Sequence, residues 1–468
     1  MLISNSIRGR ALRALSVIRL RPFDTSTVEG RSNERLRRVF WTATTSALAK
    51  GVNTLAILVS VPITLGYLGT ERYGLWMAIT SIVAFLGFAD LGIGNVILNL
   101  VTESSGKNDV EAARKCVSNA FFMLIWISAG LAFLFVLIYP YVGWAQVFNV
   151  SSSMAGQEAG PAVATFVACF LINLPLSIIP RIQMGYQEGY LSSTWQGIAN
   201  LLGLAGLVAI VHLKAGLPWL VLVITGSPAL GNLLNGISLF AFQRPWLIPR
   251  WQDQSALIAR QIVWVGFLFL ILQVTNAITY SADNIIIARV LGPEAVTNYA
   301  VPSKLFTLLP TTLYMFLIPL WPAYGEASAR GDDSWAKKTL AKAILGTFVL
   351  CLLSALFLLA FGEKILQVWT GSKVMFSLSL MIGLGAWTTL QSVVTAIALF
   401  LNAMNKIGFQ TMFALLTAFF ATLAKVVLAG SVGLPGVAWG NIAASAVFML
   451  IPYTIYVVRR FSGPQKEV

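Results

Sequence analysis

Residues 68–95 read LGTERYGLWMAITSIVAFLGFADLGIGN, an apolar stretch that ends in Asp90, two glycines and an asparagine. The surrounding chain has 468 residues, of which 57% are hydrophobic and 11% are charged, and its mean hydropathy is +0.78. Soluble domains are nearer to about half apolar and a quarter charged. The composition therefore predicts a polytopic membrane protein, in which an acid at the end of an apolar stretch needs a reason.

Apolar runs of the length needed to cross a bilayer, about 20 residues, recur throughout the chain. Their unbroken length disfavours a β-barrel, whose strands would appear as short alternating segments. The predicted class is an all-α polytopic membrane protein with twelve transmembrane helices. We expect these spans roughly at 42–67, 73–101, 117–140, 161–182, 194–213, 217–242, 262–288, 296–322, 339–361, 376–401, 410–430 and 435–458.

The net charge of +14 follows the predicted topology. If the N-terminus is cytoplasmic, most of the 32 Lys and Arg residues, Arg181 among them, fall on the cytoplasmic side. The positive-inside rule then predicts that both termini are cytoplasmic, and we expect no nucleic-acid partner. The basic segment 1–40 lacks the features of a signal peptide, so we expect a disordered tail or an amphipathic helix on anionic lipid.

The stretch 68–76 has an echo at 291–299, where the leading Leu-Gly pair, the glutamate and the final aromatic residue recur. Because each half would contain six spans, both halves begin on the same side, and the repeats are parallel about an axis along the membrane normal. Such transporters hold substrate in a central cavity between two pseudo-symmetric lobes, which rock against each other. Further pairs that support the repeat are 103–115 with 326–338, 187–190 with 406–409, and the Leu-Pro dipeptides that begin at 217 and 434.

The repeat also predicts the domain organisation. Asp90 lies on a span, 73–101, that we expect to face the central cavity, and its neighbouring glycines permit close packing or a local break in the helix. The predicted segments are a basic cytoplasmic tail (1–40), an N-lobe with spans 1–6 (41–242), a cytoplasmic linker (243–260), a C-lobe with spans 7–12 (261–458) and a cytoplasmic tail (459–468).

Ionisable side chains inside predicted spans are candidate functional residues, because a charge in a bilayer is costly. Lys50, Lys304 and Lys425 are expected to contact an anionic substrate. The alternatives are an internal salt bridge, for example between Lys50 and Asp90, and, for Lys425, snorkelling to the nearer surface. Asp90 and Asp283 are expected to couple a proton or a cation, or else to tie neighbouring spans together.

Polar residues complete the predicted substrate-binding set. Asn53 and Asn276 occupy matching places in the two repeats, and Gln273 occupies the place that matches Lys50. The sequence has no Walker A loop and no HExxH or GxSxG motif, so we expect no enzymatic chemistry, no metal site and no cofactor. The membrane potential or an ion gradient would then drive transport.

The motif LGTERYGLW, the run FADLGIGN and the loop after Glu103 resemble the oligosaccharide, or O-antigen type, lipid flippases. These polysaccharide biosynthesis transporters belong to the multidrug/oligosaccharidyl-lipid/polysaccharide exporter superfamily. The resemblance covers roughly residues 40–458. The residues that match the family motif, which we expect to be structural, are Leu68, Gly69, Tyr73, Gly74, Trp76, Asp90, Leu91 and Gly92.

The resemblance implies a cationic central cavity, to which the three lysines would contribute. It implies a multi-pass flippase of the bacterial inner membrane that moves a polyprenyl-diphosphate-linked oligosaccharide from the cytoplasmic to the periplasmic leaflet by alternating access. The pathway would make O-antigen, capsule or exopolysaccharide. The expected partners are the lipid-linked oligosaccharide, membrane lipids, and polymerase and chain-length proteins of that pathway.

Other functions stay open at the level of sequence. A drug or organic-cation antiporter of the same superfamily would need an acid in the first span, where this chain has Lys50 and no acid. A peptidoglycan-precursor flippase normally has extra spans, and a major-facilitator transporter would carry a G-x-x-x-D-R-x-G-R/K loop where this chain has TESSGKNDVEAARK. From a different class, a non-transporting scaffold for polysaccharide assembly also fits.

Overall fold

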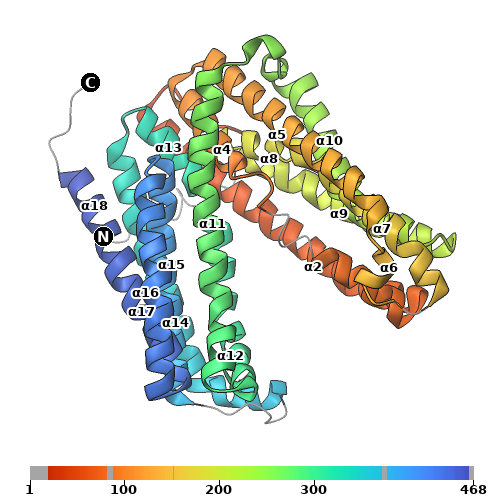
Figure 1. Ribbon diagram of the computed structural model, residues 1–468. Helices are drawn as coiled ribbons and strands as arrows, with labels where there is room; N and C mark the ends of the chain where they lie inside the picture. The colour runs from red at the N-terminus through yellow and green to blue at the C-terminus, as the bar shows by residue number, and fades with distance from the viewer. Residues whose placement is uncertain (1–18, 20, 82–87, 151, 371–376, 463–468) are drawn as a thin grey trace. The chain divides into compact units, whose positions relative to one another are not determined.

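The computed structural model describes residues 19, 21–81, 88–150, 152–370 and 377–462 (Figure 1). Over these ranges every regular element is a helix, and 11 helices are long and apolar enough to cross a membrane. The predicted second span, 73–101, includes residues 82–87, which lie outside the described ranges. The expectation of an all-α polytopic membrane protein is confirmed.

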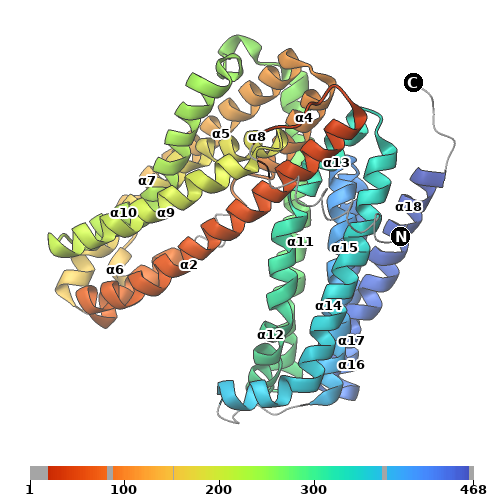
Figure 2. The same cartoon turned by 180° about the vertical axis from the view of Figure 1, so that it is seen from behind.

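The chain forms two units, Met1–Gly266 (unit 1) and Phe267–Val468 (unit 2), and α11 (Ala256–Val290) runs from the first into the second. Within unit 1, α2, α9 and α10 lie side by side (Figure 2). The helices of unit 1 are α2 (Val28–Ser81), α4 (Ile93–Lys107), α5 (Val110–Ile138), α6 (Trp144–Val147), α7 (Ser153–Leu176), α8 (Ile178–Gly185), α9 (Gly189–His212) and α10 (Leu217–Ile237). The helices of unit 2 after α11 are α12 (Pro293–Leu317), α13 (Leu320–Ala329), α14 (Asp333–Thr370), α15 (Leu378–Ala403), α16 (Ile407–Val432), α17 (Leu434–Ser445) and α18 (Ile451–Ser462).

Both units turn at a glycine whose backbone angles other residues avoid. α2 is kinked at Gly69, with φ 73° and ψ 175°, and α12 is preceded by Gly292, with φ 92° and ψ 162°. Such angles are almost confined to glycine. These are the two glycines that the sequence repeat pairs, so the repeat reproduces a backbone conformation as well as residue types.

Matching helices also end in the same way. After α4 the amide of Asp109 donates to the carbonyl of Ser104 at 2.9 Å. After α13 the amide of Asp332 donates to the carbonyl of Ala327 at 2.8 Å in the same way. A second matched corner, after α8 and after α15, places Gln187 and Asn405 in the left-handed region. The sequence comparison pairs Gln187 with Lys406, so the backbone places this match one residue earlier.

The run after Asp90 forms a tight turn at the start of α4. Leu91 and Gly92 have φ angles of 50° and 77°, and the Asp90 carboxylate accepts from the amides of Gly92 (3.0 Å) and Gly94 (3.4 Å). A Cβ at Gly266 would lie 2.9 Å from the carbonyl oxygen of Leu91, so α11 approaches this turn closely within unit 1. The acid and glycines of the opening stretch therefore build a helix start and a backbone contact.

The segment after α10 is attached to unit 1 by side chains of α5. Arg114 lies 2.8 Å from a carboxylate oxygen of Asp253. The Asn119 amide donates to the Asp253 carbonyl and accepts from the Ser255 amide, both at 3.0 Å. The segment 243–260, which the sequence marks as a linker, is therefore fixed to α5, and the boundary of unit 1 falls beyond it.

A second contact fixes the start of this segment. Arg244 donates to both carboxylate oxygens of Glu188, at 2.6 and 2.8 Å, and its guanidinium carbon lies 4.1 Å from the ring centre of Tyr186. Burial raises the pKa of the Tyr186 hydroxyl to about 12, so the phenol is neutral at physiological pH. The neutral ring can then hold the guanidinium on its face by a cation–π contact.

Candidate functional site

Lys50 and Asn53 lie on α2, and both side chains are exposed. Among the residues that the structure describes, no carboxylate oxygen lies within 4 Å of the Lys50 ammonium. The salt bridge between Lys50 and Asp90 that the sequence left open is therefore absent in this conformation. The prediction that Lys50 contacts an anionic substrate remains.

The predicted polar residues of unit 2 lie on α11 and α12. Asn276 and Lys304 are exposed, and Gln273 is half-buried. Within the described ranges, no carboxylate oxygen lies within 4 Å of the Lys304 ammonium. α12 continues through Pro302, so this proline does not end the helix before Lys304.

Lys425 and Asp283 form a buried ion pair inside unit 2. The Nζ atom of Lys425, on α16, lies 2.6 Å from Oδ1 of Asp283, on α11, and the lysine side chain has no exposed surface. The ammonium also donates to the backbone carbonyl of Thr279 at 3.2 Å. Lys425 therefore does not snorkel in this conformation, and its charge is compensated by the acid.

The Asp283 carboxylate accepts from two further side chains. The hydroxyl of Tyr299, on α12, donates to Oδ2 at 2.8 Å, and Nδ2 of Asn441, on α17, lies 3.2 Å from the same oxygen. The cluster thus ties four helices together through one acid. Removing the lysine would leave a buried charge without compensation, which is strongly destabilising.

Close packing of α16 and α17 brings Asn441 to the ion pair. A Cβ at Gly440 would lie 2.8 Å from the amide nitrogen of Lys425, so only glycine allows this approach. The spacing Gly436-x-x-x-Gly440 is the small-residue pattern that lets membrane helices touch. Asn441 is not among the site residues predicted from the sequence, although the glycine pattern directly before it signals a close helix contact.

The cluster around Asp283 is a structural contact in this conformation. The substrate role of Lys425 and the coupling roles of Asp283 and Asp90 stay predictions. In the part of the chain that the structure describes, no group of three or more His, Cys, Asp or Glu side chains could hold a metal ion.

The remaining motif residues are found at structural positions. Trp76 is buried in the apolar core of unit 1, Tyr73 packs against that core, and Gly74 is exposed. Between them and the Gly69 kink, Arg72 binds both carboxylate oxygens of Glu158, on α7, at 2.7 and 2.8 Å. The motif therefore positions the corner of α2 and supplies core residues.

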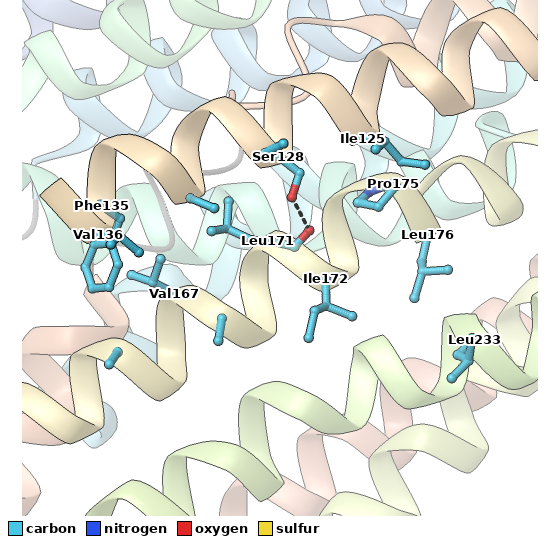
Figure 3. Close-up of a pocket in the computed structure, with 14 residues that line it drawn as sticks. Ile125, Ser128, Phe135, Val136, Val167, Leu171, Ile172, Pro175, Leu176 and Leu233 are labelled. Atoms are coloured by element: carbon cyan, nitrogen blue, oxygen red, sulfur yellow. Dashed lines mark hydrogen bonds between the residues drawn. The ribbon is translucent and has the colours of Figure 1, made fainter.

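An apolar cavity of about 700 Å³ lies in unit 1 between α5 and α7 (Figure 3). The hydroxyl of Ser128 points to the backbone carbonyl of Leu171 and donates to it at 2.7 Å, so the cavity offers no unpaired side-chain group for a polar ligand. Its walls cannot compensate a charged head group. The lining residues are Ile125, Ser128, Ala129, Ala132, Phe135, Val136, Ala164, Val167, Ala168, Leu171, Ile172, Pro175, Leu176 and Leu233.

Comparison with known proteins gives consistent matches. Residues 39–328 match the model of the family described as "Polysaccharide biosynthesis protein". A protein described as an O-antigen transporter of Salmonella typhimurium is 22% identical over 434 residues, which cover 90% of this chain and 97% of that protein. A protein of Yersinia pseudotuberculosis described as an O-antigen export protein is 22% identical over 370 residues, 77% of this chain and 83% of its own length.

Solved structures with the same fold are transporters. A MATE transporter of Vibrio cholerae superposes with a TM-score of 0.74 at 15% identity, covering 92% of this chain and 98% of that chain. An outward-facing multidrug resistance MATE family transporter of the MOP superfamily gives a TM-score of 0.73 at 15% identity, over 90% and 95% of the two chains. The chain therefore belongs to the polysaccharide biosynthesis protein family and has the fold of these MATE transporters.

Proposed function

We propose that this protein is a flippase of the bacterial inner membrane that moves a polyprenyl-diphosphate-linked oligosaccharide from the cytoplasmic to the periplasmic leaflet. Family membership and relatives described as O-antigen transport proteins support a polysaccharide-related cargo. The observation that carries the proposal is an exposed lysine inside a candidate span of each unit, Lys50 in Val28–Gly69 and Lys304 in Ala295–Ala329.

The charges of these spans favour an anionic cargo. A diphosphate that leaves water needs nearby cations, because its desolvation is otherwise too costly. Lys50 and Lys304 are exposed, whereas the intramembrane acids Asp90 and Asp283 already accept bonds from backbone amides and from Lys425. An organic-cation antiporter would need an acid available to its substrate, so this arrangement supports it less well.

The proposed cycle is alternating access with both termini in the cytoplasm. An inside-negative potential favours outward movement of an anion by about 2.3 kcal/mol per charge for each 100 mV. The potential alone can therefore drive a diphosphate outward, and no bound cofactor enters the proposal. Polymerase and chain-length proteins of the same pathway would receive the flipped product.

The decisive measurement is flipping of a fluorescent polyprenyl-diphosphate oligosaccharide in proteoliposomes. Lys50→Ala and Lys304→Ala should each reduce the initial rate about tenfold or more, the effect of losing one charge-assisted contact. Lys214→Ala in unit 1 and Lys364→Ala in unit 2 remove the same charge from exposed positions near helix ends and should flip at the wild-type rate. Thermal unfolding of each variant checks that it is folded.

Four outcomes decide the proposal. Loss of flipping in the folded Lys50 or Lys304 variants supports a cationic substrate path. Wild-type flipping that both changes leave intact would remove these lysines from the site. A wild-type protein that exports organic cations and does not flip the lipid would establish the antiporter instead, and one that does neither would favour the scaffold.

A further inference from the structure

Arg181 is an exposed arginine inside a candidate membrane span. From the sequence it is predicted to be a cytoplasmic charge, but it lies on α8, within the span Ser153–Gly185 that α7 and α8 form together. Its side chain is exposed in the structure. A charge at such a position usually faces water, a polar path or a partner, because exposure to lipid is costly.

Close packing against α4 positions the Arg181 side chain. A Cβ at Gly94 would lie 3.2 Å from Nε of Arg181, and a Cβ at Gly185 would lie 2.8 Å from the side chain of Val101. The hydroxyl of Thr102 also donates to the Gly185 carbonyl at 3.3 Å. These contacts advance in the same direction along both helices, so α4 and α8 run parallel here, with the arginine beside Gly94.

Arg181 and Lys50 lie on two helices of unit 1, α8 and α2, that both pack against α9. Arg181 lies four residues, or about 6 Å, before the end of α8 at Gly185, and Gly197 lies eight residues, or about 12 Å, after the start of α9. Gly197 packs against Ala49, the residue directly before Lys50: a Cβ at Gly197 would lie 3.9 Å from the Cβ of Ala49. Both α2 and α8 contact α9, so the two cations lie on helices that flank α9.

The nearest acid does not neutralise Arg181 directly. An Asp90 oxygen lies 3.0 Å from the Cβ position of Gly94, but the Asp90 carboxylate accepts from the amides of Gly92 and Gly94. Among the described residues, no carboxylate oxygen lies within 4 Å of the Arg181 guanidinium. Its terminal nitrogens are therefore available to a ligand.

We propose that Arg181 is a binding residue for the diphosphate group of the lipid-linked substrate, acting with Lys50 on unit 1; this inference rests on the proposed function. The planar guanidinium can bind two phosphate oxygens at once, whereas the Lys50 ammonium acts as a point charge. Arg181 therefore contributes the preference for a diphosphate over a monophosphate, and Lys50 contributes attraction to either anion.

The test measures binding of farnesyl diphosphate and farnesyl monophosphate to the purified full-length protein in detergent. Wild type should bind the diphosphate more tightly. Arg181→Lys, which keeps the charge, should lose most of this preference, and Arg181→Gln should weaken diphosphate binding by about tenfold or more. Arg289→Gln, an exposed arginine at the end of α11, is the control and should bind as wild type does.

The remaining outcomes separate the two proposals. If Lys50→Ala weakens binding but both Arg181 variants bind and discriminate as wild type does, the inference about Arg181 is wrong and the flippase stands. If wild type does not bind the diphosphate, the proposed function fails. Asp90→Asn should not reduce diphosphate affinity; a reduction equal to that of Arg181→Gln would show that the arginine only supports the turn before α4.

Discussion

The interiors of the two units differ in chemistry at matching places. Trp76 and Tyr299 lie at the same distance along the chain from the matched glycines Gly69 and Gly292. In the same way, Leu207 of unit 1 matches Lys425 of unit 2 when both are counted from the second matched corner, Gln187 and Asn405. Trp76 and Leu207 are buried in one apolar core. Tyr299 and Lys425 instead donate to the carboxylate of Asp283.

The other two members of the cluster show the same replacement. Asp283 corresponds to Ser60, whose hydroxyl bonds within its own helix to the carbonyl of Ile57 at 3.1 Å. Asn441 lies seven residues after Leu434, and the residue seven places after the matching Leu217 is Ile224, which packs against the apolar core of unit 1. Similar backbone positions therefore hold apolar packing in unit 1 and a network of hydrogen bonds and an ion pair in unit 2. Losing one partner of such a buried network lowers stability strongly.

Lys425→Met should have the largest effect, because it leaves Asp283 buried without its cation. We expect the free energy of unfolding to fall by about 3–5 kcal/mol, measured as thermal unfolding of the purified protein. Leu207→Met, the volume-conserving change at the matching place, should cost less than about 1.5 kcal/mol. Adding Asp283→Asn to Lys425→Met should recover part of the loss, whereas equal costs for the two single variants would contradict the comparison.

The glycine corners should respond alike in both units. Gly69→Ala and Gly292→Ala force a side chain into a conformation that costs of order 1–3 kcal/mol, and neither Cβ would meet an atom within 4 Å. Gly66→Ala, three residues earlier on α2 and equally open, should be neutral or stabilising by up to about 1 kcal/mol. A cost at only one corner would mean that the two backbones are not equivalent.

Gly440→Ala tests the close contact that places Asn441. Its Cβ would lie 2.8 Å from the backbone of Lys425, so α16 and α17 must separate, at a cost of about 1–3 kcal/mol. Gly430→Ala, on α16 with nothing within 4 Å of its Cβ, is the control. Equal stability of the two variants would show that this contact adapts easily.

The smallest effect is expected for the ion pair of unit 1. Arg72 and Glu158 lie near the end of their helices and keep 12% and 15% of their side-chain surfaces exposed. Arg72→Gln should therefore cost only about 1–2 kcal/mol, because water can solvate the remaining acid. A double-mutant cycle with Glu158→Gln measures the coupling, and a value as large as that of Asp283 with Lys425 would remove the distinction between the two pairs.

The separate members of the unit 2 cluster could be found in the sequence, but not their pairing. Lys425 and Asp283 are conspicuous because charges are rare in apolar spans. Lys425 lies on α16 and Asp283 on α11. From the sequence, Lys425 is predicted to be a substrate contact or a snorkelling side chain. Their meeting depends on the rotation and depth of two helices that are far apart in the chain, which the approach of Gly440 to Lys425 helps to set.

For Arg181, the position in the fold, and not the pairing, could not be found from the sequence. The sequence places it at the last turn of the predicted span 161–182, next to a cytoplasmic loop, so it is predicted to be a cytoplasmic charge. Its neighbours become visible only when α8 is packed against α4, which places the Arg181 side chain beside Gly94. Position along the sequence gives depth only within an unbroken span, and here α7 and α8 are separate helices.

The sequence by itself determined the membrane class, the helical fold, the parallel repeat and the glycine corners. These properties follow from local composition and from backbone angles that only certain residues tolerate. The tertiary structure decided which charges are compensated: Lys425 is buried against Asp283, while Lys50 and Lys304 are exposed. Compensation depends on distances between side chains on different helices, and those distances exist only after the helices have packed.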